Sequence, residues 1–244
     1  MFEFLLVIPT LNEDKYIGSM LLNSEKELRS IYSDGRFLIV VADAGSEDAT
    51  ISVVERFMKN HRNVVLTRSS HIAERGYDVM HAMSMHKSKL YCYIDADLAP
   101  SLPYLRRAIT KSAEGYDLVL GSRYLRASIT RRPAVRRLFS IVYNGLIRNM
   151  FSDGITDHQC GFRIFNRKAF RVLSKKSTER HWVWDTEVIL IARHSNLKII
   201  ETPIKWVEQR SDKTNYSRLL RDILLFIPGI ARLIYRFILG RELG

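Results

Sequence analysis

The stretch Leu90-Tyr91-Cys92-Tyr93-Ile94-Asp95-Ala96-Asp97-Leu98 decides the fold that we expect for this chain. Its apolar and aromatic residues fit a buried central strand, and Asp95 and Asp97 follow where that strand would run out into a crevice. Such crevices are where open α/β sheets bind ligands. Because residues i and i+2 share a face in a strand, both carboxylates could reach one Mg²⁺ or Mn²⁺, with a substrate phosphate as a further ligand. A polar strand end or helix cap is the alternative.

Strand-like and helix-like segments alternate over the first two-thirds of the chain. Strand signals lie near 2–8, 37–42, 64–67, 90–94 and 118–121, and helical patterns near 15–29, 48–59, 75–86 and 103–112. This order predicts an α/β fold with a mostly parallel sheet flanked by helices on both faces.

The regular alternation of strand-like and helix-like segments ends after Arg123. We expect a basic, amphipathic helix near 131–151, and then a loop, a short strand, a helix, a longer strand and a polar loop, at 152–161, 162–165, 184–194, 198–207 and 208–215. One domain, residues 1–216, would contain these elements.

The tail, residues 217–244, sets arginines among leucine, isoleucine and phenylalanine. This composition is typical of a helix that lies in a membrane interface, and the alternative is a helix that packs its apolar stripe on the domain. We expect Pro228-Gly229 to kink or split the segment. No stretch approaches the ~20 uninterrupted apolar residues that cross a bilayer, so membrane contact should be peripheral.

The 244 residues carry 38 Lys and Arg against 26 Asp and Glu, a formal net charge of +12. Such an excess implies a polyanionic partner, whether nucleic acid, an anionic membrane surface or a phosphorylated substrate. The two cysteines form no C-x-x-C pair, which favours a reduced, cytosolic setting. The N-terminus starts directly with a strand-like run, so we expect it to belong to the fold and not to a signal peptide.

Two further strand exits lie on the same predicted sheet edge. Backbone groups of Pro9, Thr10 and Leu11 could bracket a nucleotide base, while Glu13 and Asp43 can accept hydrogen bonds from base N–H groups or ribose hydroxyls.

Ser46 and Asp48 are typical of helix caps, and we expect that role for both. The chain contains neither a P-loop nor a dinucleotide-binding fingerprint. His158 and Cys160 provide only two of the four ligands of a structural zinc site, which argues against zinc.

Several motifs, in order and spacing, resemble the GT-A glycosyltransferases of family 2. They are P-T-L-N-E at 9–13, D-A-G-S-E-D-A-T at 43–50, D-A-D-L at 95–98, G-S-R at 121–123 and D-H-Q-C-G-F-R-I-F at 157–165. The last is similar to a segment of the polyprenyl-phosphate sugar synthases, above all the dolichyl-phosphate glucose synthases. W-D-T-E at 184–187 and P-I-K-W at 203–206 strengthen the match, which extends to about Asn215.

The resemblance implies a role for each matching residue on the donor side. Asp43 would contact the base, Asp95 and Asp97 would hold Mg²⁺ or Mn²⁺ on the donor diphosphate, and Arg123 would neutralise phosphate charge. Arg75 stands near a Gly-Lys-Gly segment of the family, so a phosphate contact there would fall to Arg75.

On the acceptor side, Asp157, Gln159 and Gly161 would shape the sugar and acceptor site. Asp185 and Glu187 would face that site from the next helix. The acceptor phosphate would be gripped by Arg210 and Lys213.

The sequence departs from the family pattern in three places, one of which is Glu74-Arg75-Gly76 in place of the Gly-Lys-Gly segment. Ala44 replaces the usual second Asp, which leaves Asp43 alone on the base. Mannose synthases often place Gln shortly after D-x-D, whereas this chain has Leu98-Ala99-Pro100, which favours the glucose branch.

Elementary chemistry agrees with an arginine-rich acceptor site. A lipid phosphate is already an oxyanion near neutral pH, so it can attack the sugar directly when held in line, without a general base. Transfer then demands positive charge on the leaving diphosphate and around the acceptor. A single displacement would invert the anomeric centre.

We therefore expect a peripheral enzyme on the cytoplasmic face of a membrane that moves glucose from UDP-glucose onto dolichyl or polyprenyl phosphate. The first alternative is mannose transfer from GDP-mannose. The alternative of another class is a basic membrane- or RNA-binding module without turnover. We expect no nucleic acid as partner, because the chain shows no motif of nucleic-acid readers.

Overall fold

A computed structural model describes residues 1–68, 74–97, 102–207 and 216–240, and for 216–225 it gives only the course of the helix. Seven strands form one sheet in the order β3-β2-β1-β4-β7-β5-β8. They are β1 (Phe2–Thr10), β2 (Phe37–Asp43), β3 (Val64–Arg68), β4 (Ser88–Ile94), β5 (Leu118–Ser122), β7 (Phe162–Asn166) and β8 (Ile199–Pro203). All neighbours pair in parallel except β7, which runs antiparallel between β4 and β5. The predicted mostly parallel α/β sheet is confirmed.

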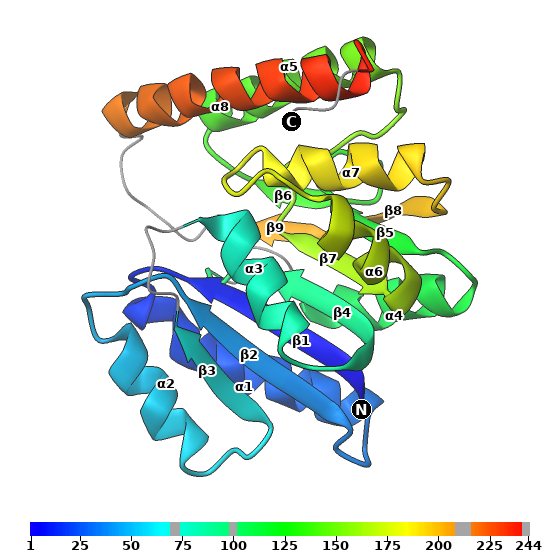
Figure 1. Cartoon of the computed structure of the whole chain (residues 1–244). Coiled ribbons are helices and arrows are strands. Elements are labelled where there is room, and N and C mark those ends of the chain that lie inside the picture. Colours follow the sequence, from blue (N-terminus) through cyan, green and yellow to red (C-terminus); the bar gives the residue numbers. More distant parts are fainter. Residues whose placement is uncertain (69–73, 98–101, 208–215, 241–244) are drawn as a thin grey trace.

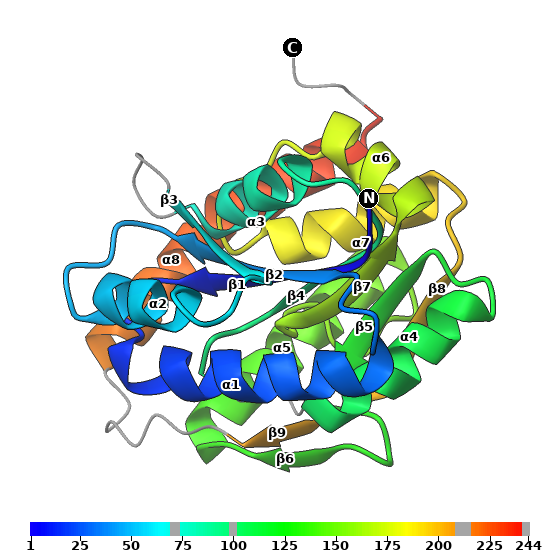
Figure 2. The same cartoon turned by 90° about the horizontal axis from the view of Figure 1, so that it is seen from below.

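Helices cover both faces of this sheet. In Figures 1 and 2, α1 (Asp14–Ile31), α2 (Thr50–Met58) and α4 (Leu105–Ala113) lie on one face, and α4 follows a short 3₁₀ turn, η1 (Leu102–Tyr104). The other face carries α3 (Arg75–Ser84), α6 (Arg167–Lys176) and α7 (Trp184–His194).

The period of two along the buried strands divides the core between these faces. Phe4 and Leu6 of β1 pack in the cluster that contains α1, α2 and α4, whereas Leu5 and Val7 pack with α3, α6 and α7. A strand that is apolar on both sides is typical of a sheet covered twice.

The second half of the chain differs from the prediction in detail. The expected strand at 198–207 is two strands, because β8 ends at Pro203 and β9 (Lys205–Val207) leaves the sheet to pair in parallel with β6 (Ile129–Arg131). β6 and α6 were not predicted. The apolar face of α6 is narrow, with Ala169 and Leu173 buried, and its start is fixed by the side chain of Asn166, which accepts a hydrogen bond from the Ala169 N–H.

Two further helices, α5 (Ala134–Phe151) and α8 (Tyr216–Phe237), lie side by side above α7 (Figure 1). The rings of Tyr143 on α5 and Phe226 on α8 meet edge to face, with centroids 5.2 Å apart. The basic amphipathic helix expected near 131–151 is present, although Arg131 belongs to β6.

The described half of α8 packs on the domain. Leu233 is buried against Val183 and Leu190, and Gly229 lies so close to Val183 that a Cβ there would be 2.5 Å from its Cγ2 atom. Of the kink or split expected at Pro228-Gly229, the split is wrong. One helix continues through Pro228, whose exposed position costs the helix a hydrogen bond on its solvent side. In the part of the chain that the structure describes, no helix is long and apolar enough to cross a membrane.

Candidate active site

The two carboxylates of the D-x-D motif lie just beyond a central strand of the sheet. The prediction from side-chain alternation placed Asp95 and Asp97 on one face of the strand. β4 instead ends at Ile94, so both residues lie in the turn after it. The Asp95 N–H donates to the Gly161 carbonyl oxygen at 3.1 Å, which ties this turn to the start of β7. The Asp95 carboxylate lies against the Cα of Gly161, where no side chain would fit.

The surroundings of Asp95 fit a hard divalent cation. Burial, together with the negative charges of Asp97 and Asp185, raises the pKa of Asp95 to about 6, although Arg75 opposes the shift. Carboxylate oxygens are the ligands that Mg²⁺ and Mn²⁺ prefer. Among the described residues, no group of three or more His, Cys, Asp or Glu side chains gathers around one point. Asp95 and Asp97 would therefore need ligands from a bound substrate.

Asp185 lies in the first turn of α7, close enough for its charge to act on Asp95. Its carboxylate accepts a hydrogen bond from the Tyr93 hydroxyl and lies 3.3 Å from Arg163 Nη2 and 3.7 Å from Arg75 Nε. Arg163 is fully buried in β7 and also donates to the backbone oxygen of Asp185. Sequence analysis assigned no role to Tyr93 or Arg163. A charged residue inside the apolar run Phe162-Arg163-Ile164-Phe165 was the signal that could have revealed the second.

Arg123 and Asp157 form a buried bidentate pair. Arg123 Nε and Nη2 donate to the two carboxylate oxygens of Asp157, each at 2.7 Å, and Nη2 also donates to the Gln159 carbonyl at 3.0 Å. Burial alone would raise the pKa of Asp157, but the Arg123 guanidinium outweighs it and holds the pKa below its usual value. Arg123 is thus paired with a buried carboxylate, and the same guanidinium also borders the adjacent cavity.

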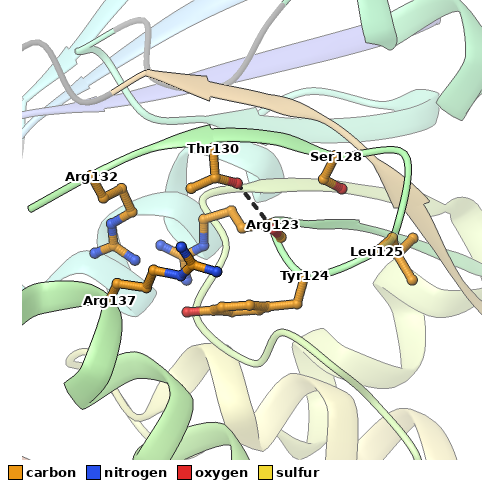
Figure 3. A pocket seen from close by; sticks show the side chains of 7 residues that line it. All are labelled: Arg123, Tyr124, Leu125, Ser128, Thr130, Arg132 and Arg137. Carbon is orange, nitrogen blue, oxygen red and sulfur yellow. Dashed lines mark hydrogen bonds between the residues drawn. The ribbon is translucent and has the colours of Figure 1, made fainter. Parts of the chain in front are cut away.

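That cavity, of about 250 Å³, lies between the turn after β5 and the start of α5. Its lining consists of Arg123, Tyr124, Leu125, Ser128, Thr130, Arg132 and Arg137. Figure 3 shows the guanidinium groups of Arg123, Arg132 and Arg137 gathered at one end of it. Within the described chain, the Arg137 guanidinium has no hydrogen-bond or ion-pair partner. Three guanidinium groups in one cavity make a site for an anion.

Sequence analysis missed this cavity, because Arg132 and Arg137 were assigned to the basic, amphipathic helix expected near 131–151. Arg132 Nη1 donates to the hydroxyl of Ser140, one turn into α5, at 3.1 Å, which turns its guanidinium toward the helix start. The arginine doublets at 131–132 and 136–137 were the available signal.

Gln159 and Glu187 occupy different places. The Gln159 amide donates to the hydroxyls of Thr186 at 3.0 Å and Tyr143 at 3.4 Å, so Gln159 spans the space between α7 and α5 near Asp185. Glu187 is fully buried away from this cluster. Its carboxylate accepts hydrogen bonds from the backbone of 178–179, from two hydroxyls and from Arg236 of α8. These contacts make Glu187 a structural residue, in contrast to the expected role in the site.

Asp43 holds together the loops that follow β1 and β2, where the nucleotide is predicted to bind. Its Oδ2 accepts the N–H groups of Gly45 and Ser46, each at 3.0 Å, and Oδ1 accepts the hydroxyls of Ser46 and Thr10. The side chain is buried and organises the loop, so the predicted contact with a base would be added to these bonds.

Asn12 joins the two loops and was not singled out in the sequence. It adopts a left-handed backbone with φ of 57°, and its side-chain oxygen accepts the N–H groups of Glu47 and Asp48. Asp48 accepts the N–H groups of Thr50 in α2 and of Asp14 at the start of α1, but the N-cap positions of these helices are Ala49 and Glu13. Ser46 accepts from the Asn12 N–H and caps no helix, because its hydroxyl is turned to Asp43.

The remaining predicted positions of this half border the same edge. Pro9 and Thr10 end β1, Leu11 is exposed after it, and Glu13 is buried before α1. Arg210 and Lys213, and the run at 98–100 that favoured glucose, lie outside the described residues.

Comparison with known proteins places these motifs. Residues 5–174 match the model of Glycosyl transferase family 2. The chain is 30% identical over 223 residues to "Glycosyltransferase AglD" of Haloferax volcanii, an alignment that covers 91% of this chain and 35% of that protein. It is 28% identical over 225 residues to "Dolichyl-phosphate beta-glucosyltransferase ALG5D" of Trichomonas vaginalis, covering 88% and 69%. The chain thus spans about a third of the length of the first relative.

A solved structure with a similar fold is glucosyl-3-phosphoglycerate synthase from Mycobacterium tuberculosis, crystallised with Mn²⁺, uridine diphosphate and glucosyl-3-phosphoglycerate. The TM-score is 0.72 at 15% identity, and the match covers 100% of this chain and 82% of that one. At this identity the likeness shows the fold, which is the arrangement that the motifs predicted.

Proposed function

Because the chain belongs to glycosyl transferase family 2, we propose that it is an inverting glycosyltransferase that moves a hexose from a nucleotide diphosphate onto a polyprenyl or dolichyl phosphate. The observation that carries the acceptor part is the cavity with three arginines, Arg123, Arg132 and Arg137. It is suited to a phosphate monoester of a lipid, because guanidinium groups bind phosphate through parallel hydrogen bonds.

Segment 157–161 connects this cavity to the donor half. Asp157 and the Gln159 carbonyl hold Arg123, while the Gly161 carbonyl holds the backbone of Asp95. An acceptor phosphate bound by the arginines would therefore lie next to a sugar diphosphate bound at the carboxylates. This juxtaposition supports in-line attack by the phosphate oxygen.

For the donor half, Asp95 and Asp97 would hold Mg²⁺ or Mn²⁺, and this cation supplies charge neutralisation on the leaving diphosphate. In the structure Arg75 contacts the Asp95 carboxylate and lies beside Asp185, and Gln159 donates to Thr186 at the position proposed for the wall of the sugar site. No residue needs to act as a general base, because the acceptor phosphate is already ionised. A single displacement gives a β-linked product from an α-linked donor.

Glucose from UDP-glucose is the donor that we propose. The names of relatives such as ALG5D support it, since they specify dolichyl-phosphate beta-glucosyltransferases. Mannose from GDP-mannose remains the alternative that the same assay would reveal.

The outward face of α5 supports action at a membrane surface. Large apolar side chains are exposed along it, namely Val135, Leu138, Phe139, Ile141, Val142 and Leu146. The arginines at 131–137 lie at the start of the same helix. An apolar face beside guanidinium groups fits the interface of an anionic bilayer, and we propose peripheral binding to the cytoplasmic face.

Transfer of labelled sugar tests the proposal. UDP-glucose and GDP-mannose would each be incubated with polyprenyl phosphate in detergent and Mg²⁺ or Mn²⁺, and label would be counted in the organic phase. We expect label from UDP-glucose. Label from GDP-mannose would show that the donor is GDP-mannose. Metal-dependent hydrolysis of the donor without lipid-borne label would refute polyprenyl phosphate as the acceptor. Polyanion binding with neither transfer nor hydrolysis would favour a binding module.

The cavity itself has a matched control. Arg137→Met should raise the KM for polyprenyl phosphate about tenfold while the KM for the nucleotide sugar stays the same, because a charged hydrogen bond contributes roughly 1.5–3 kcal/mol. Arg148→Met removes an exposed arginine of the same helix outside the cavity and should leave both constants unchanged. Equal effects of the two variants would show that the arginines act through general charge.

A further inference from the structure

The guanidinium of Arg75 lies within the cluster of carboxylates at the end of β4. Its Nη2 atom is 2.6 Å from Asp95 Oδ1, and its Nε atom is 3.7 Å from Asp185 Oδ2. The guanidinium carbon also lies over two aromatic rings, 5.5 Å from the centroid of Tyr93 and 5.2 Å from that of Trp182. The side chain is 16% exposed.

This contact occupies the carboxylate that the proposed metal site depends on. The charges of Asp97 and Asp185 act on Asp95, and uncompensated negative charge at buried or half-buried carboxylates is costly. Oδ1 of Asp95 is one of the two oxygens through which this residue could bind a cation, and Arg75 holds it. The buried Nε atom of Arg75 has no hydrogen-bond partner. The guanidinium therefore bonds Asp95 through Nη2 while its Nε–H remains without an acceptor.

We propose that Arg75 is the resident counter-ion of the metal-free site, which holds Asp95 until a divalent cation binds and must leave Asp95 when it does. The inference rests on the metal site of the proposed function. It makes Arg75 a positioning residue that competes with the cation, and not a ligand or a simple phosphate contact.

The backbone around Arg75 is fixed, so the exchange is a movement of the side chain. The N–H groups of Gly76 and Tyr77 donate to the Arg180 carbonyl at 2.7 and 3.3 Å, which anchors the start of α3. A Cβ at Gly76 would lie 2.4 Å from the Trp184 ring, so the helix start is also packed tightly on α7. After release from Asp95, Asp185 and the faces of Tyr93 and Trp182 remain as partners for the guanidinium.

Titration of Mn²⁺ without nucleotide or acceptor, followed by electron paramagnetic resonance, tests the competition. Arg75→Met keeps much of the side-chain volume but removes the charge, and we expect it to bind Mn²⁺ about tenfold more tightly than the wild type, since a charged hydrogen bond no longer has to be broken. Arg180→Met is the matched control. Arg180 is 62% exposed and lies over Tyr77 and beside Glu74, so its loss should change the affinity by less than about threefold.

Unchanged or weaker Mn²⁺ binding in Arg75→Met, with normal binding by the wild type, would overturn this inference and leave the metal site standing. Absence of binding in both proteins would refute the metal site and the inference together. Binding by Arg75→Met alone would support the competition in its strongest form.

A second measurement is made on the wild type and does not depend on the folding of Arg75→Met. Trp182 emission should change saturably when Mg²⁺, which is not paramagnetic, is added to the wild type, because Arg75 moves relative to the Trp182 ring. The change should disappear in Trp182→Phe, although Trp184 and Trp206 still emit in this variant. A Mg²⁺ response that persists in Trp182→Phe, or no response where Mn²⁺ binds, would contradict the movement of Arg75.

Discussion

A Cβ atom added at Gly161 would lie 1.9 Å from Oδ2 of Asp95. The same glycine accepts the Asp95 N–H through its carbonyl, so the start of β7 fixes both the backbone and the carboxylate of the first D-x-D residue. Glycine is therefore required at 161 for close approach, and its φ is not in the left-handed region. The relationship ties the site to a strand that runs against the direction of its neighbours.

Gly161→Ala should displace the Asp95 carboxylate and lower the transfer rate about 10²-fold, which is the scale of a shift of roughly 1 Å in a catalytic group. Gly145→Ala serves as control, because a Cβ at this position of α5 meets nothing within 4 Å. In a helix interior alanine is favoured over glycine by about 1 kcal/mol, so this variant should melt higher and keep its activity. Full activity of Gly161→Ala would show that the carboxylate is not where the reaction needs it.

The ionisation of Asp95 should determine how the affinity for Mn²⁺ depends on pH. The pKa of Asp95 in the folded protein is about 6, above the usual 3.8. Without a cation, the contribution of this group to the free energy of unfolding is therefore fully present below about pH 4 and is lost as the pH rises through 6. A cation needs the ionised form, so its affinity should fall about tenfold for each pH unit below 6 and level off above it. Calorimetry in buffers of different ionisation enthalpy should detect proton release at pH 5.5 and little at pH 7.5. Equal proton release at both pH values would be inconsistent with this titration.

The buried pair of Arg123 and Asp157 predicts a large loss of stability when it is broken. Arg123→Met leaves a buried carboxylate without its partner and should cost about 3–5 kcal/mol in urea denaturation at pH 7. Arg36→Met breaks exposed pairs, since this side chain is 61% exposed, and should cost less than about 1 kcal/mol.

Replacing both partners, as in Arg123→Met with Asp157→Leu, should recover most of the loss, because no charge remains buried alone. The pKa of Asp157 is held below 3.8, so its contribution is present above about pH 4 and is lost as the pH falls below that value. A difference between wild type and Arg123→Met that did not shrink in acid would contradict the pairing as its source.

The sequence was sufficient to place the residues predicted for the donor half at one edge of the sheet. Strands such as β1, β2 and β4 are continuous apolar runs followed at once by polar motifs, and this local pattern predicts both the strand and the sheet edge where its side chains meet. Asp95 and Asp185 were found because each stands at the end of a recognisable element.

The acceptor half depends on contacts that no local pattern reveals. Arg132 and Arg137 line a cavity only because β6 pairs with β9, which lies more than 70 positions away, and this pairing places the start of α5 beside Arg123. Glu187 shares the first turn of α7 with Asp185, and both are buried, yet helical geometry turns Glu187 to a different face, toward the loop at 177–179. Distinguishing the two carboxylates required the packing of α8, whose Arg236 forms an ion pair with Glu187.

Membrane binding should depend on the outward face of α5. Leu138 and Val142 are each 61% exposed and one turn apart, so Leu138→Asp with Val142→Asp should weaken binding to vesicles that contain anionic lipid by at least tenfold, since each apolar side chain contributes about 1.5–3 kcal/mol when fully buried. The control is Leu22→Asp on α1, an equally apolar side chain that is 57% exposed and belongs to the opposite end of the molecule in Figure 1. Because all three side chains are exposed, the melting temperatures should stay close to that of the wild type. Vesicle flotation checks the expectation, and equal loss in the α1 variant, or none in the α5 variant, would place the membrane contact elsewhere on the chain.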